Sequence, residues 1–66
     1  MIRRCVLCAT YAPGLRWFVD AGTWRGVVHQ VCHKAHLEGL RGDARALKQL
    51  GERGARIVER MRKGLI

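Results

Sequence analysis

The stretch that decides the fold opens with Cys5-Val6-Leu7-Cys8 and closes with His29-Gln30-Val31-Cys32, with twenty residues between the two segments. Two residues between paired ligands let both side chains point inward from one tight turn. Cysteine and histidine at this spacing are typical of a structural zinc site with four tetrahedral ligands. We therefore expect zinc as the cofactor, bound by Cys5, Cys8, His29 and Cys32.

Three histidines compete for the fourth position of this set. We favour His29 because a residue at the end of a strand often completes such sites. Cys32 and His36 are four residues apart, so on a helix they share one face and His36 is an alternative fourth ligand. His33 is a third choice on the same helix. A competing interpretation, in which the cysteines are buried only as small apolar side chains, leaves their spacing unexplained.

The chain has 66 residues, which is room for one small domain. A single apolar core of this size supplies only a few kcal/mol, so a chain of this length usually needs disulfides, a metal or a partner to stabilise the fold. The first forty residues contain only two carboxylates, Asp20 and Glu38, and neither lies in a catalytic motif. We expect a protein that is not an enzyme and has no small-molecule substrate.

The three cysteines are an odd number, which argues against a disulfide framework and favours a reducing, cytoplasmic location. No stretch approaches the roughly 20 apolar residues of a membrane span, so we expect no membrane partner.

The gap between the two ligand pairs predicts a β-hairpin. Residues 15–20 and 23–28 are rich in aromatic and β-branched side chains and flank Ala21-Gly22. Gly26 interrupts the second of these segments and indicates a bulge or a close approach of another backbone.

The composition from Gln30 onward predicts helix, with apolar or small residues at alternating steps of three and four. We expect a break at Gly42-Asp43, with Gly42 as the C-terminal cap of one helix and Asp43 as the N-cap of a second. The alternative is one long helix that is bent or frayed near residues 51–54.

The expected order of elements is a Cys-x2-Cys turn, called a zinc knuckle, then a hairpin, then a ligand pair at the start of a helix. This order resembles the treble-clef family of zinc fingers over roughly residues 3–41. The ligand pattern is also similar to the first zinc module of LIM domains. The resemblance implies a small zinc-stabilised α+β fold with a C-terminal amphipathic helix. The usual glycine after the first knuckle is replaced by Ala9. We expect a zinc module at residues 1–42 and a basic helical tail at residues 43–66, packed on the module or dimerising.

The formal net charge is +8, and arginine outnumbers lysine. A surface of this charge attracts nucleic acid, and arginine suits a bidentate grip on phosphate. We expect a regulatory module that binds nucleic acid, DNA or RNA. The alternative is a solvated basic face, partly neutralised by Glu52 with Arg56 and Glu59 with Lys63. The expected nucleic-acid-binding residues are Arg3, Arg4, Arg16, Arg25, Lys34, Arg41, Arg45, Lys48, Arg56 and Arg60.

A second hypothesis is a protein-interaction module, an adaptor or an inhibitor of a larger complex. The helical tail carries an apolar seam that consists of Leu40, Leu47, Val58 and Met61. If the tail projects from the zinc module, this seam needs a partner, which can be an acidic protein or a second copy of the chain. If the tail folds back on the module, the seam becomes part of the core. We also expect Trp17 or Trp24 to pack against Leu37 and Leu40.

Overall fold

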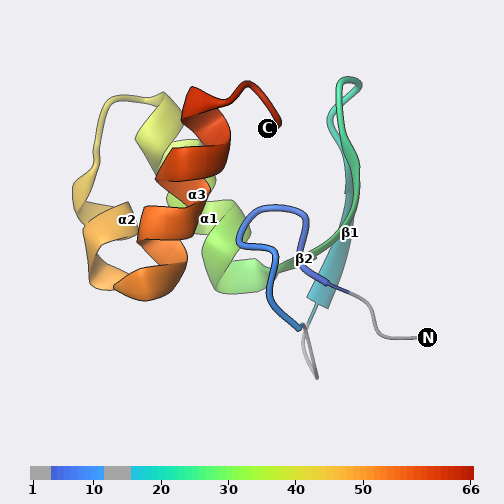
Figure 1. The fold of residues 1–66 in the computed structure, drawn as a ribbon, viewed down its shortest axis with the longest axis horizontal. Helices are drawn as coiled ribbons and strands as arrows, with labels where there is room; N and C mark the ends of the chain where they lie inside the picture. Colours follow the sequence, from blue (N-terminus) through green and yellow to red (C-terminus); the bar gives the residue numbers. More distant parts are fainter. Residues whose placement is uncertain (1–3, 12–15) are drawn as a thin grey trace.

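A computed structural model describes residues 4–11 and 16–66 of the chain, which form a small α+β fold (Figure 1). Arg3 lies outside the described residues, as does the side chain of Arg16. The N-terminal loop lies between the hairpin on one side and the helices on the other (Figure 1). The elements in chain order are β1 (Arg16–Asp20), β2 (Arg25–His29), α1 (Gln30–Leu40), α2 (Arg45–Gln49) and α3 (Glu52–Arg62).

The hairpin predicted between the ligand pairs is confirmed. β1 and β2 pair antiparallel, and their register runs from Arg16 opposite His29 to Asp20 opposite Arg25. The turn is closed by the backbone N–H of Ala21, which donates to the Trp24 carbonyl at 2.9 Å. β2 (Arg25–His29) therefore begins and ends later in the chain than the predicted segment 23–28. His29 is thus the last residue of the strand.

Gly26 marks a close approach, as its position inside a strand predicted. A Cβ atom on this residue would lie 2.5 Å from the Val6 side chain. Beside it, the Val6 N–H donates to the Val27 carbonyl at 3.0 Å. The absence of a side chain at Gly26 thus lets the N-terminal loop lie directly against β2.

The helical region breaks at Gly42, as the sequence indicated. The N–H of Gly42 donates to the Gly39 carbonyl at 3.1 Å, and the N–H of Asp43 donates to the Glu38 carbonyl at 3.0 Å. These two bonds are the Schellman motif that ends helices on a left-handed glycine. Ala44, and not Asp43, is the N-cap residue of α2. Asp43 instead stabilises the turn that precedes α2, because its carboxylate accepts a hydrogen bond from the N–H of Arg45 at 3.0 Å.

The region after residue 43 contains two helices, so the prediction of a single tail helix is wrong. α2 ends at Gln49 and α3 begins after Gly51, which has a φ of +62°. The alternative, one long helix bent or frayed near residues 51–54, is also wrong, because the chain breaks at Gly42 as well as at Gly51. Gly54 then lets α3 cross α2 closely, because a Cβ atom there would overlap the Leu47 carbonyl.

The core lies where the helices, the N-terminal loop and β2 meet. Leu7, Val28, Leu47 and Ile57 are buried together with the three cysteines and Ala35. Arg60 fastens α3 to the loop, since its Nε donates to the Val6 carbonyl at 2.9 Å. The last two helices thus fold back onto the first half of the chain.

The residues of the apolar seam have different environments. Leu47 is buried, whereas Val58 and Met61 are partly buried against the core. Leu40 is 62% exposed. Most of the seam is therefore covered by this chain itself.

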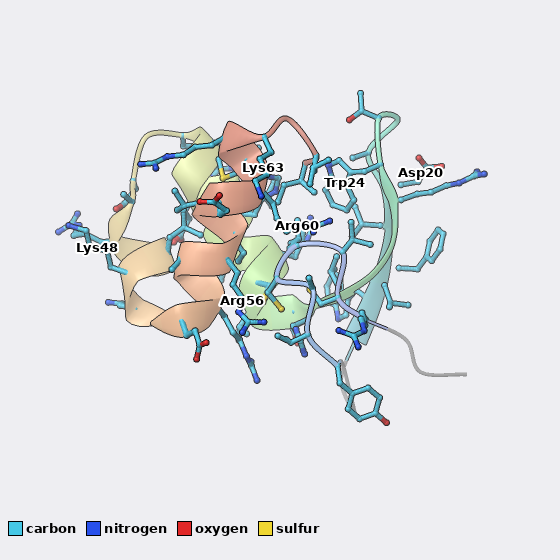
Figure 2. The ribbon with its side chains drawn as sticks, viewed as in Figure 1. Asp20, Trp24, Lys48, Arg56, Arg60 and Lys63 are labelled. Atoms are coloured by element: carbon cyan, nitrogen blue, oxygen red, sulfur yellow. The ribbon has the colours of Figure 1, made fainter. Side chains whose placement is uncertain are left out.

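Leu37 and Leu40 do not form the core that was expected beside a tryptophan. Both leucines are exposed, and Trp17 is half exposed. α1 instead buries the face that carries Cys32, Ala35 and His36. Trp24 lies between the hairpin and the helices and meets His36 edge to face, with the ring centroids 6.0 Å apart (Figure 2). Burial of this face, which includes Cys32, turns Leu37 toward solvent.

Candidate metal centre

Four side chains from three parts of the chain meet in the core. Cys5 and Cys8 come from the N-terminal loop, His29 from the end of β2, and Cys32 from the first turn of α1. Their ligand atoms all lie within 4.8 Å of one another, and all four residues are buried. A Cys3His group of this kind can hold a metal ion. It contains the four residues that the sequence put first.

The loop around Cys5 and Cys8 is closed by its own backbone. The N–H of Cys5 donates to the Thr10 carbonyl, and the N–H of Ala9 donates to the Cys5 carbonyl, each at 2.8 Å. The Thr10 hydroxyl lies 2.9 Å from the sulfur of Cys8 and can donate to it as a thiolate. These bonds direct both sulfur atoms toward the same point.

Ala9 completes this loop in an unusual backbone conformation. Its φ is +61°, and it is the one residue other than glycine with positive φ in the part of the chain described. The left-handed conformation brings Cβ close to the following carbonyl oxygen, which is why glycine is preferred there. The loop therefore carries backbone strain at the position where the resemblance to treble-clef fingers led us to expect glycine.

The ring of His29 is oriented by a backbone carbonyl. Its Nε2 lies 3.1 Å from the oxygen of Tyr11, which can only accept, so Nε2 carries the proton. Nδ1 then presents its lone pair to the sulfur atoms of Cys8, at 3.5 Å, and Cys32, at 3.6 Å. A carbonyl partner that fixes the tautomer is the usual support of a metal-binding histidine.

His36, the alternative ligand, lies outside this group of four. It is only 4% exposed, and its Nε2 has no hydrogen-bond partner within the described residues. Burial, and then the charge of His33, lower the pKa of His36. A buried neutral imidazole against Trp24 contributes to packing.

The sulfur atoms strongly influence one another's ionisation. A hydrogen bond from the Cys32 thiol lowers the pKa of Cys5 to about 4. The same hydrogen bond, together with burial and the charges of the neighbouring cysteines, raises the pKa of Cys32. All three cysteines can be thiolates in so small a volume only if a cation lies among them, and a bound metal deprotonates its thiol ligands outright.

The predicted nucleic-acid-binding residues are spread over several faces of the molecule. In Figure 2, Lys48 lies at the end of the helices away from the hairpin, whereas Arg56 and Arg60 lie beside the N-terminal loop. Arg4 and Arg56 line one hollow. Arg60 is held by the Val6 carbonyl. The other predicted nucleic-acid-binding residues that the structure describes are exposed. They lie on β2 (Arg25), on α1 (Lys34), just after α1 (Arg41) and on α2 (Arg45 and Lys48).

Two residues that the sequence did not single out border the same region. Tyr11 lines the hollow of Arg4 and Arg56, and Arg53 lines an adjoining one. The spacing of three residues between Arg53 and Arg56 places both on one helix face, which was visible in the sequence. For Tyr11 the available signal was its closeness to the first ligand pair.

Comparisons with protein-family models, with curated proteins and with solved structures find no match. Among the described helices, none combines the length and the apolar character needed to cross a membrane. The functional interpretation therefore depends on the geometry and charge of this chain.

Proposed function

We propose that this protein is a small zinc finger that binds nucleic acid through an arginine-rich surface and acts as a regulatory module in a reducing compartment such as the cytoplasm. The observation that carries the proposal is the excess of basic side chains without acidic partners around a buried metal centre. Zinc is the scaffold in this proposal, and arginine provides the contacts.

The donor set and its spacing support zinc as the metal. Zinc bond lengths of about 2.3 Å to sulfur and about 2.0 Å to nitrogen place tetrahedral ligand atoms about 3.6 Å apart. The distances of 3.5 Å and 3.6 Å between His29 Nδ1 and two of the sulfurs agree with this value. Four buried protein ligands leave no position for a reacting water, so the zinc is structural. The succession of knuckle, hairpin and ligand pair at the start of α1 supports a treble-clef finger.

The ion pairs of the surface leave most of its positive charge uncompensated. Within the described residues, Asp43 pairs with Arg45, Glu52 with Arg56, and Glu59 with Lys63. Such exposed pairs are each worth well under 1 kcal/mol and are easily exchanged for phosphate. The described basic residues outside these pairs, the side chain of Arg16 left aside, are Arg4, Arg25, Lys34, Arg41, Lys48, Arg53, Arg60 and Arg62.

The test is binding of the zinc-loaded protein to labelled duplex DNA, single-stranded DNA and RNA, followed by fluorescence anisotropy as salt is raised. We expect affinity to fall steeply with salt, because each phosphate contact releases about 0.7–0.9 counterions. Polyglutamate of equal length is the control for charge alone. The proposal is wrong if no nucleic acid binds at low salt, or if polyglutamate binds equally well.

A second candidate function, a protein-interaction module, is favoured by exposed apolar side chains. Phe18 on β1 is 69% exposed and Leu40 at the end of α1 is 62% exposed. Large apolar side chains at the surface are common in protein interfaces. Sedimentation of the purified protein tests for a homodimer, and a shift to the monomer mass in Leu40→Ser would support one.

A further inference from the structure

The N-terminal loop and α3 enclose a hollow whose walls carry both charge and an aromatic ring. We define this loop hollow by Arg4, Ala9, Thr10, Tyr11 and Arg56, and its volume is about 620 Å³. Tyr11 is 57% exposed. An exposed tyrosine that lines a hollow together with two arginines can bind an unpaired nucleotide, because the ring can stack on the base and the guanidinium groups can hold the phosphate.

The metal centre holds one wall of the loop hollow in place. Arg4 and Tyr11 face each other in an antiparallel bridge. Arg4 Nη1 also donates to the Ala9 carbonyl at 3.4 Å. The Tyr11 carbonyl accepts the Nε2–H of His29 at 3.1 Å. The backbone that carries the ring is therefore fixed before any ligand arrives, which reduces the entropy lost on binding.

The opposite wall belongs to α3 and carries its charge toward the loop. Arg56 lies beside the loop in Figure 2, and it borders this hollow together with two neighbouring ones. Arg53 extends the positive wall along the helix toward Thr10. Glu52 holds one end of the Arg56 guanidinium at 3.1 Å in an exposed pair. A phosphate can replace this carboxylate at small cost.

We infer that the loop hollow is a binding site for one nucleotide of a single-stranded nucleic acid, with the base stacked on Tyr11 and its phosphate held by Arg4 and Arg56. This inference rests on the proposed function. It goes further in fixing the location and in excluding duplex as the ligand of this site, since the bases of a duplex are already stacked on each other. DNA and RNA share the base and phosphate on which the site acts.

The test compares two oligonucleotides of equal length and charge, oligo(dT) and the same backbone without bases, by fluorescence anisotropy. Stacking on one aromatic ring corresponds to roughly a 5- to 160-fold preference for the oligomer with bases. We expect Tyr11→Leu to abolish this preference and Tyr11→Phe to retain it. Oligo(U) in a parallel titration distinguishes RNA from DNA as the preferred source of the nucleotide.

Matched variants separate this site from general attraction. Phe18→Leu removes a more exposed aromatic ring on β1, and Lys48→Gln removes a charge at the far end of the helices. Arg56→Gln is expected to weaken binding more than Lys48→Gln does. The site assignment is overturned if oligo(dT) binds but Tyr11→Leu changes affinity no more than Phe18→Leu. If wild type binds no nucleic acid at all, the proposed function itself fails.

Discussion

Ala9 offers a direct test of the loop that carries Cys5 and Cys8, through the substitution Ala9→Gly. The φ of +61° at this residue costs an alanine roughly 1–2 kcal/mol. Glycine adopts the conformation freely, but its greater freedom in the unfolded chain takes back roughly 0.4–1 kcal/mol. We expect a net gain of roughly 0.5–1 kcal/mol in the free energy of unfolding, which raises Tm by about 2–8 °C for a chain of this size.

The measurement is thermal unfolding of the zinc-loaded protein, followed by circular dichroism at constant free zinc. The matched control is Ala55→Gly, which makes the same chemical change at an exposed position inside α3. There glycine is expected to lower stability by about 0.5–1 kcal/mol, because the helical backbone gains nothing from its freedom. The reasoning about strain is refuted if both substitutions lower Tm by similar amounts.

Three further predictions concern the metal and the helix crossing. Cys8→Ser, or a strong chelator, should unfold the protein, because structural zinc supplies on the order of 10 kcal/mol of folding free energy. Loss of the circular dichroism signal measures the unfolding, and a chelated protein that stays folded would contradict the prediction. His29→Ala should lose zinc affinity while His36→Ala still binds one equivalent, as measured by elemental analysis; the reverse result would make His36 the ligand. Gly54→Ala should destabilise the fold by about 2 kcal/mol or more, since its Cβ overlaps the Leu47 carbonyl. The new Cβ in Gly42→Ala meets no atom, so this variant should lose only the free energy associated with its positive φ. Denaturant titrations measure both losses, and equal losses would argue against the close crossing of α2 and α3.

The metal-binding group and the hairpin were predictable because both depend on local patterns. Ligand spacing identified Cys5, Cys8 and Cys32, and the position of His29 at a strand end selected it over His36. The break at Gly42 followed from the chemistry of a left-handed cap. The hairpin and the Gly42 cap are each determined within a few residues of sequence, and so is each of the two ligand pairs, which the hairpin then brings together.

The features that the sequence did not predict depend on contacts between distant residues. The apolar spacing from Leu37 to Leu65 is the same for one long helix as for three short ones that fold back. Gly54 decides the matter through its contact with Leu47, which no periodicity reveals. Leu37 was expected to be buried because it is apolar, but α1 turns the face with Cys32, Ala35 and His36 inward. The nature of the partner cannot be read from charge alone.

The bond between Arg60 and the Val6 carbonyl joins residues 54 positions apart. It has a consequence for the order in which a newly made chain acquires its structure. All four residues of the Cys3His group precede residue 33, so the proposed zinc ion would find its full set of ligands as soon as that segment leaves the ribosome. At about 5–20 residues per second, the 28 residues from Cys32 to Arg60 require roughly 1–6 s more. During this interval the Cys3His group lacks the later helices that share its core, and we expect it to be most open to oxidation or to a chaperone then.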